Sequence, residues 1–348
     1  MSATREPEII GLDGPKVQKW IDGLGIGAQL PLTFSRVGAG QSNLTFLVTD
    51  TDRGRWVLRR PPLGKLLASA HDVAREHRIL TSIEDSSVPT PAVYGLCTDP
   101  EVTDVPLMLV EYVDGRVIDD LATAEALTED QRRRTGLSLA RTLGKVHEVD
   151  LEATGLDTLA SHKPYAERQL KRWRMQWEGS HSRDVPLVNE LADRLAAAVP
   201  EQRELALVHG DFHLLNVITD PTSCEVSAVL DWELCTLGDP LADVGGLLAY
   251  WPQQGDLPVP HAAPTLPGFP THAQLVAEYA AATGRDTSDV GFWHVLGLWK
   301  IAIISDGVRR RAEDDPRNAY QVRSGPSRDE IIDALLARAA READAIGL

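Results

Sequence analysis

Short apolar runs separated by turn-forming residues dominate the first hundred positions of the chain. A helical pattern at about 14–24 is followed by runs of β-branched, aromatic and aliphatic residues at 32–37, 44–49 and 55–60. Glycine, aspartate and threonine between these runs are typical of tight turns. The pattern predicts an antiparallel meander, and a further strand is expected at 105–112.

Helical periodicity takes over in the second part of the chain, after one earlier helix predicted over 70–83. The later candidate helices lie at 128–149, 163–178, 185–198, 272–283 and 290–311. Short strands are predicted at 206–208, 217–218 and 226–231. A sheet followed by helices indicates an α+β fold with two lobes. Residues 252–270 contain six prolines and no helical period, which predicts a long surface loop or a lid over a substrate.

Composition is that of an ordinary globular protein, except for its charge. Hydrophobic residues make up 43% and charged residues 25% of 348 positions, but the formal net charge is −16. Most of this charge lies in residues 111–308, which contain 16 basic and 30 acidic side chains. This excess disfavours nucleic acid or an anionic membrane as the main partner, and it leaves open a cationic partner or a role in solubility alone. The oligomeric state stays open.

Cysteine content and hydropathy indicate the compartment. The three cysteines, Cys97, Cys224 and Cys235, are too few and too widely spaced for a zinc cluster or a disulfide framework. The amino-terminal residues lack the pattern of a secretory signal, and no window of 18 apolar residues is present. We therefore expect a cytoplasmic protein.

The segment 208–216, with the sequence VHGDFHLLN, carries the strongest chemical signal. A predicted strand leads into a loop with Asp211, Asn216 follows five residues later, and a second strand ends at Asp231. Phosphoryl transfer needs a carboxylate that orients the attacking hydroxyl and oxygen ligands that hold Mg²⁺. Asp211 fits the first role, and Asn216 and Asp231 fit the second. Each residue alone is an ordinary turn or capping residue, but the joint spacing favours catalysis.

This combination resembles the aminoglycoside phosphotransferase/choline kinase-like family, which has a protein-kinase-like fold. HGDxxxxN, the DWE segment at 231–233 and the GDPLAD segment at 238–243 carry the resemblance. Together with VLRRPP at 57–62 and EYVDG at 111–115, they are most similar to the branch related to the kinase-like module fused to some acyl-CoA dehydrogenases. The resemblance implies a nucleotide-binding lobe over 1–110, a hinge at 111–115 and a helical catalytic and substrate lobe over 116–348.

The resemblance also implies the nucleotide-binding residues of the first lobe. The glycine-bearing hairpin that ends in Ser42 and Asn43 is expected to cover the phosphates. Val57 and Arg59 share one side of their strand, and Arg59 replaces the lysine typical of the family. Glu76 on the following helix is its expected partner. A register slip of one residue would give the role of Arg59 to Arg60, and both arginines could also be merely solvated.

At the hinge, the resemblance implies backbone contacts with the base of the nucleotide. The carbonyl of Glu111 and the N–H of Val113 are the expected groups. The nucleotide is expected to be ATP, with GTP as the alternative, together with Mg²⁺. His209 and the acids Asp239 and Asp243 are expected to brace the catalytic loop rather than to react.

The sequence therefore predicts an ATP- and Mg²⁺-dependent kinase that phosphorylates a hydroxyl of a small metabolite. A hydroxyacyl-CoA or a similar alcohol is one candidate substrate, for which the basic stretch at 168–174 could serve the anionic portion. The second hypothesis is a nucleotide-binding pseudokinase that acts as a regulatory or interaction module, which the absence of the strand lysine favours. The intact Asp211, Asn216 and Asp231 argue for the enzyme.

Overall fold

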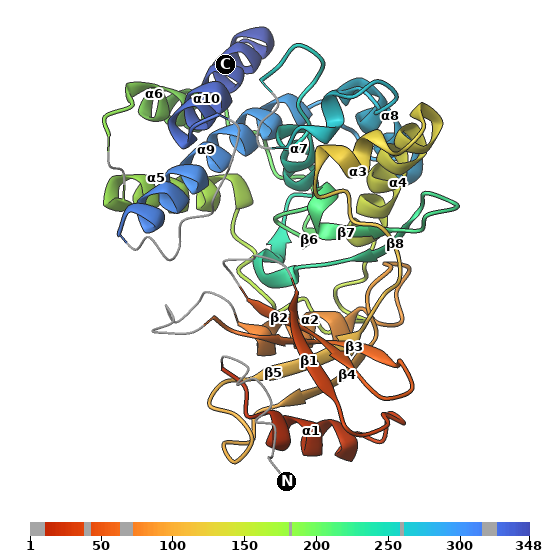
Figure 1. The fold of residues 1–348 in the computed structure, drawn as a ribbon. Helices are drawn as coiled ribbons and strands as arrows, with labels where there is room; N and C mark the ends of the chain where they lie inside the picture. Colours follow the sequence, from red (N-terminus) through yellow and green to blue (C-terminus); the bar gives the residue numbers. More distant parts are fainter. Residues whose placement is uncertain (1–10, 38–42, 63–71, 181–182, 258–260, 315–325) are drawn as a thin grey trace. The chain divides into compact units, whose positions relative to one another are not determined.

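The chain divides into two compact units in a computed structural model, which describes residues 11–37, 43–62, 72–180, 183–257, 261–314 and 326–348 (Figure 1). Unit 1 comprises Met1–Asp85, Thr90–Asp114 and Asp231–Glu233, and unit 2 comprises Ser86–Pro89, Gly115–Leu230 and Leu234–Leu348. The segment 231–233 therefore belongs to the unit formed mainly by the first third of the chain. The functional division into lobes at 110 and 115 stays a prediction.

Unit 1 contains a five-stranded antiparallel sheet, as the apolar runs predict. Its strands, in the order in which they lie side by side, are β1 (Thr33–Val37), β2 (Leu44–Thr49), β3 (Arg55–Arg60), β5 (Leu107–Glu111) and β4 (Val93–Cys97). Strand β4 was not predicted. It is short, contains Gly95 and follows two prolines, so its own sequence resembles a loop. Pairing with the buried strand β5 makes it part of the sheet.

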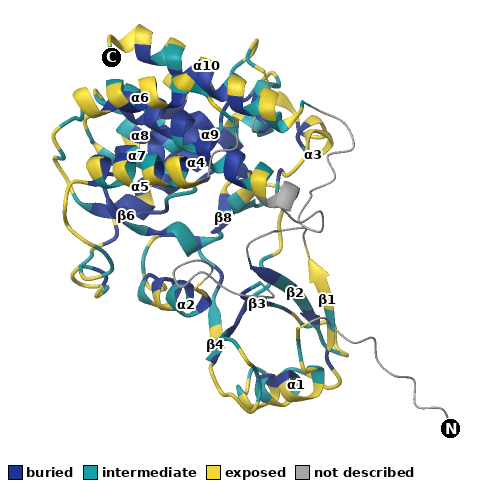
Figure 2. Ribbon diagram, turned by 90° about the vertical axis from the view of Figure 1, so that its left-hand side faces the viewer, coloured by how far each residue is buried: buried dark blue, intermediate teal, exposed yellow. Residues whose placement is uncertain are grey.

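Two helices accompany this sheet. Helix α1 (Gly14–Gly23) begins at Asp13, whose carboxylate accepts a hydrogen bond from the N–H of Lys16, as is typical of an N-cap. It buries Val17 and Ile21 in one apolar cluster with side chains of β2, β3 and β5 (Figure 2). Helix α2 (Val73–Ser82) packs against β4 and β5 and begins at the cap Asp72. Helix α2 carries Glu76, which is only 2% exposed.

Unit 2 is mainly helical. Its helices are α3 (Leu121–Glu125), α4 (Glu129–His147), α5 (Tyr165–Ser180), α6 (Pro186–Ala197), α7 (Leu241–Ala249), α8 (His272–Thr283), α9 (Val290–Asp314) and α10 (Arg328–Ile346). Helices α3, α7 and α10 were not predicted. The long helix α9 packs against both α7 and α10 and is mostly buried (Figure 2). The absence of a side chain at Gly245 allows this packing, because a Cβ there would lie 2.2 Å from the backbone of Trp293.

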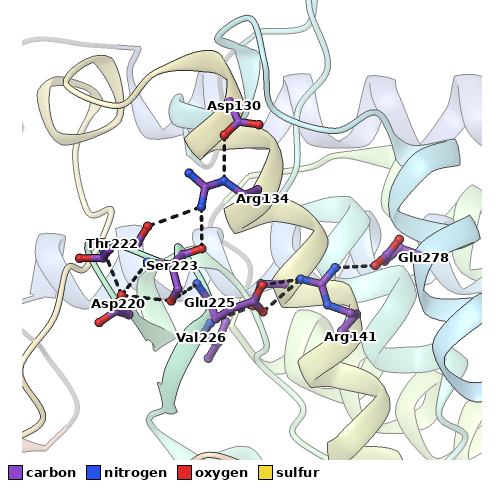
Figure 3. Close-up of polar contacts among 10 residues, drawn as sticks. Asp130, Arg134, Arg141, Asp220, Thr222, Ser223, Glu225, Val226 and Glu278 are labelled. Atoms are coloured by element: carbon purple, nitrogen blue, oxygen red, sulfur yellow. Dashed lines mark hydrogen bonds and ion pairs between the residues drawn. The ribbon is translucent and has the colours of Figure 1, made fainter.

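Two small antiparallel strand pairs complete unit 2. Strand β6 (Ala206–Val208) pairs with β9 (Thr236–Gly238), which was not predicted, and β7 (Val217–Thr219) pairs with β8 (Val226–Val229). Figure 3 shows how α4 holds the β7–β8 hairpin: Arg141 forms an ion pair with Glu225, and Arg134 donates hydrogen bonds to the carbonyls of Thr222 and Ser223. Asn216, which directly precedes β7, is thereby attached to a supported hairpin.

The proline-rich segment 252–270 is only partly the surface loop that its composition predicts. Its second half packs within unit 2: Phe269 makes an edge contact with Trp251, whose indole N–H donates to the carbonyl of Pro270. Arg132 of α4 also donates to the carbonyl of Pro267. Residues 258–260 lie outside the described residues. Among the helices of the described chain, none combines the length and hydropathy needed to cross a bilayer.

Candidate active site

In unit 1, strand alternation separates the two neighbouring arginines of β3. Trp56, Leu58 and Arg60 are buried, whereas Val57 and Arg59 point to the other face. Arg59 Nη2 lies 3.2 Å from Glu76 Oε2 and 3.2 Å from Asp231 Oδ1. Arg60 Nη2 instead lies 3.3 Å from Asp104 Oδ1. The predicted ion pair between Arg59 and Glu76 is therefore present, and the nucleotide-binding role of Arg59 and Val57 stays a prediction.

Arg59 and three nearby carboxylates shift the pKa values of one another. Burial raises the pKa of Glu76 to about 7, and the nearby Asp231 and Glu233 add to this rise, while Arg59 opposes it. Burial would lower the pKa of the Arg59 guanidinium, but the charges of Glu76, Asp231 and Glu233 raise it instead. The guanidinium of Arg59 is thus held by carboxylates of α2 and of the segment 231–233.

The segment 231–233 supplies two of these carboxylates. Asp231 has a φ of 62°, in the left-handed region that few non-glycine residues adopt, and such strain is concentrated at functional sites. Asn43 Nδ2 lies 3.5 Å from Glu233 Oε2, and Arg75 donates a hydrogen bond to the Glu233 carbonyl. Asn43 therefore lies at the end of β2 that approaches the charged cluster. Ser42, its predicted partner in phosphate binding, lies outside the described residues.

The predicted hinge residues follow β5 and are held by β3. Arg55 stacks on the ring of Tyr112, with the guanidinium carbon 4.2 Å from the ring centroid, and forms an ion pair with Asp114 at 2.7 Å. The N–H of Glu111 donates to the carbonyl of Ala92 at 2.8 Å, and the N–H of Ala92 donates to the Glu111 carboxylate. These contacts order the backbone on either side of Val113. The contact of Glu111 and Val113 with a base stays a prediction.

In unit 2, a buried carboxylate holds the loop that begins after β6. Asp243 of α7 accepts hydrogen bonds from the backbone N–H groups of His209, at 2.6 Å, and Gly210, at 2.8 Å. His147 at the end of α4 lies 3.3 Å from the same carboxylate. The prediction that Asp243 braces this loop is confirmed. Asp239 accepts a hydrogen bond from the N–H of Leu241 and so stabilises the start of the helix that carries Asp243.

His209 has both ring nitrogens engaged with the backbone. The N–H of Asp211 donates to His209 Nδ1 at 3.3 Å, so the proton lies on Nε2, which donates to the carbonyl of Leu230 at 2.9 Å. This side chain therefore connects the loop to the end of the β8 segment. The prediction that His209 is a scaffold residue is confirmed.

Asp211 is surrounded by hydrogen-bond donors. The Tyr250 hydroxyl donates to Oδ1 at 3.1 Å, and Asn216 Nδ2 donates to Oδ2 at 3.1 Å. His213 Nε2 lies 3.4 Å from Oδ2. Burial would raise the pKa of Asp211, but the charge and hydrogen bond of His213 and the charge of Lys300 hold it well below its usual range. Asp211 is therefore held as an ionised carboxylate whose two oxygens are oriented by their donors.

The side-chain nitrogen of Asn216 binds the loop that carries Asp211. Its Nδ2 also donates to the backbone carbonyl of Asp211 at 2.8 Å. The amide oxygen Oδ1 is therefore the atom that Asn216 can offer to a cation. Asp231, the second predicted metal ligand, belongs to unit 1. That the two bind one ion stays a prediction.

A small cavity of about 30 Å³ lies beside Asp211. Trp173, Trp293 and Ile301 provide apolar walls, and Tyr250 and Lys300 provide polar atoms. The tryptophans at 173, 177, 293 and 299 are buried, and two of them, Trp173 and Trp293, also line this cavity. The sequence reasoning missed Tyr250 and Lys300. Lys300 could have been noticed, since it is the only Asp, Glu, Lys or Arg within the apolar stretch 290–304.

Known proteins with similar sequences and folds agree with this arrangement. The sequence pattern of the phosphotransferase enzyme family matches residues 33–293. Acyl-CoA dehydrogenase family member 10 of Mus musculus is 34% identical over 309 residues, which cover 85% of this chain and 28% of that protein. The chain therefore spans less than a third of the length of this relative.

Solved structures extend the comparison to the fold. A Ralstonia eutropha protein that was provisionally assigned as an aminoglycoside phosphotransferase superimposes with a TM-score of 0.77 at 29% identity, covering 95% of this chain and 99% of that one. The GDP complex of aminoglycoside 2'-phosphotransferase-IIIa has a TM-score of 0.62 at 14% identity, covering 94% and 98%. The predicted α+β protein-kinase-like fold is confirmed, and the chain belongs to the phosphotransferase enzyme family.

Proposed function

We propose that the protein is an ATP- and Mg²⁺-dependent phosphotransferase that phosphorylates a hydroxyl group of a small-molecule metabolite. The observation that carries this proposal is the state of Asp211, an ionised carboxylate whose oxygens are oriented by Tyr250, Asn216 and His213. A carboxylate held in this way accepts the proton of an attacking hydroxyl and aligns its oxygen with a phosphoryl group.

The charged cluster of unit 1 supports nucleotide binding. Among the described residues, Arg59 Nε and Asn43 Oδ1 are buried without a hydrogen-bond partner, and the phosphates of a nucleotide would satisfy the first of them. The GDP bound to aminoglycoside 2'-phosphotransferase-IIIa is consistent with a purine nucleotide. ATP is the proposed donor, with GTP as the alternative, and the backbone of Glu111 and Val113 is proposed to contact the base.

The oxygen donors of this chain fit Mg²⁺. Asn216 Oδ1 and the Asp231 carboxylate are hard ligands, and Mg²⁺ is usually held by one or two such groups together with phosphate oxygens and water. When bound, Mg²⁺ would neutralise charge on the phosphates that Arg59 contacts.

The acceptor is proposed to be an alcohol, and a hydroxyacyl-CoA is one candidate. Its support is the relation to acyl-CoA dehydrogenase family member 10, of which this chain covers only a part. The basic stretch of α5 contributes less than the sequence suggested. Arg174 forms an ion pair with Asp193, and Arg168 donates to the carbonyls of Lys163 and Leu237. Lys171 and Arg172 remain candidates for an anionic portion of the acceptor.

Replacing Asp211 by asparagine tests the proposal. Asp211→Asn keeps the size of the side chain but removes the proton acceptor, so we expect turnover to fall by about 10³-fold or more while nucleotide affinity changes little. Transfer from radiolabelled ATP into the small-molecule fraction of a cell lysate is the measurement. Asp220→Asn, in the exposed β7–β8 turn shown in Figure 3, is the matched control.

The same experiment separates an enzyme from a nucleotide-binding pseudokinase. A pseudokinase would bind ATP with wild-type affinity in every variant and label no metabolite. Transfer by the wild type that Asp211→Asn retains would contradict the role of Asp211. Absence of transfer by the wild type, with nucleotide binding intact, would favour the regulatory module.

A further inference from the structure

The ammonium group of Lys300 contacts the loop that carries Asp211. It lies on α9, where it is surrounded by apolar residues, and its Nζ donates a hydrogen bond to the carbonyl of Gly210 at 2.7 Å. The Nζ also lies 5.6 Å from the ring centroid of Trp173 on α5. Lys300 lines the cavity beside Asp211 together with this tryptophan. The lysine is therefore a polar group directed from the helical core at the candidate active site.

The backbone N–H and carbonyl of Gly210 form hydrogen bonds with two side chains of opposite charge. Its N–H donates to the Asp243 carboxylate at 2.8 Å, and its carbonyl accepts from the Lys300 ammonium. Gly210 has a φ of 82°, and a Cβ at this position would lie 2.7 Å from the carbonyl oxygen of Leu234. The carbonyl of Gly210 forms the peptide bond with Asp211, so the plane that Lys300 fixes determines where the Asp211 side chain begins.

The charge of Lys300 is directed at this loop rather than at an ion-pair partner. Within the described part of the chain, Lys300 forms no ion pair with a carboxylate, and the hydrogen bond to Gly210 is the contact that orients it. The charged groups that act on it are Asp211, Asp243 and, with opposite sign, Arg172.

We propose that Lys300 is a positioning residue for phosphoryl transfer, which holds the Gly210–Asp211 peptide through the hydrogen bond from its ammonium group to the Gly210 carbonyl. Its catalytic consequence rests on the proposed function, whereas its effect on the loop does not. Packing of the aliphatic stem against Trp173 alone would be the purely structural alternative, and it predicts that an uncharged side chain of similar length suffices.

Lys300→Met makes this distinction, because methionine keeps the apolar stem and removes the charge. We expect amide hydrogen exchange of a peptide covering 208–217 to become about tenfold faster, while exchange in the strands of unit 1 is unchanged. Turnover should fall about 10²-fold with little change in the KM for ATP, since a loop displacement misplaces Asp211 without touching the nucleotide. Lys145→Met, on the exposed side of α4, is the matched control and should behave as the wild type.

Restoring the charge completes the test. Lys300→Arg should keep slow exchange in the 208–217 peptide, and added n-propylammonium should partly restore Lys300→Ala, whereas n-propanol should not. Equal loop exchange in the wild type and Lys300→Met would overturn the proposal. Equal damage in Lys300→Met and Lys300→Arg, or equal rescue by the amine and the alcohol, would also overturn it, because the charge would then be irrelevant. A wild type without any phosphoryl transfer would refute the proposed function, and the exchange measurements would still decide the role of Lys300.

Discussion

The pKa of a carboxylate is shifted in opposite directions in the two units of the molecule. In unit 1, Glu76 lies with Asp231 and Glu233 near Arg59, and its pKa is raised to about 7. In unit 2, Asp211 is surrounded by donors and positive charge, and its pKa is held well below its usual range. Loss of water acts to raise the pKa of both carboxylates, so the neighbouring groups decide the direction.

The neighbours of Glu76 are mainly acidic and those of Asp211 are mainly donors and bases, which explains the opposite pKa shifts. The two environments suit two different roles. The acids of unit 1 suit the proposed binding of Mg²⁺ together with a nucleotide. The donors around Asp211 keep its carboxylate ionised and fix its orientation, as its proposed role in aligning a hydroxyl requires. The contrast predicts that neutralising unit 2 residues affects the rate, whereas neutralising unit 1 residues affects nucleotide binding and its dependence on pH.

Loss of the loop brace should give the largest effect. In Asp243→Asn, the amide retains one oxygen but cannot accept from both the His209 and the Gly210 N–H groups while His147 remains in place. We expect turnover to fall by about 10²-fold, because Asp211 is displaced, with a loss of stability of about 1–3 kcal/mol. Steady-state kinetics and thermal unfolding check this.

Asp239→Asn is the matched control for this change, since Asp239 stabilises only the start of α7. It should lose far less activity than Asp243→Asn. If the two variants lose similar activity, the hydrogen bonds to the loop are not the reason for the effect.

Removal of the arginine of unit 1 should act on nucleotide affinity. Arg59→Met leaves Glu76 and Asp231 without the Arg59 guanidinium, and the proposed charged hydrogen bond to phosphate would be lost. We expect nucleotide affinity to weaken about 10- to 100-fold, as judged by titration with a fluorescent ATP analogue. Arg60→Met is the control, because Arg60 lies on the buried face of β3. A larger loss of affinity in Arg60→Met would mean that the phosphate-binding role belongs to Arg60.

The smallest expected effect is a pH dependence of stability that originates in Glu76. Because the pKa of Glu76 is raised in the folded state, its contribution to stability is complete below the ordinary pKa of about 4.5 and is lost as pH rises through about 7. Relative to Glu76→Gln, the wild type should therefore lose about 1 kcal/mol between pH 6 and 7 and little more above pH 8.

Urea unfolding of both proteins at several pH values measures this difference. Parallel stability curves for the wild type and Glu76→Gln would show that Glu76 does not titrate in this range. The contrast between a raised pKa in unit 1 and a lowered pKa in unit 2 would then fail.

Local pattern was sufficient for the elements with strong periodicity. The strands at 44–49 and 55–60 match the structure at both ends, because alternating apolar residues and flanking turn residues determine a half-buried strand without outside help. Strand β4 was missed, because Gly95 and the preceding prolines are loop-like and only pairing with β5 makes the segment extended. Helix α7 was missed for a similar reason: its GDPLAD start reads as a turn.

The residues of the candidate site also fall into two groups, those that the sequence predicts and those that only the tertiary structure adds. Spacing in the sequence alone predicted Asp211, Asn216 and Asp231 as site residues, since phosphoryl transfer needs those residue types within one strand, loop and strand unit. The choice between Arg59 and Arg60 needed the register of β3, because a shift of one residue exchanges the two faces of a strand. Only the tertiary structure could add Tyr250 and Lys300, which lie 39 and 89 residues from Asp211 in the sequence. Hydrogen bonds between distant segments have no local pattern, so the donors that keep Asp211 ionised were decided by the packing of α7 and α9.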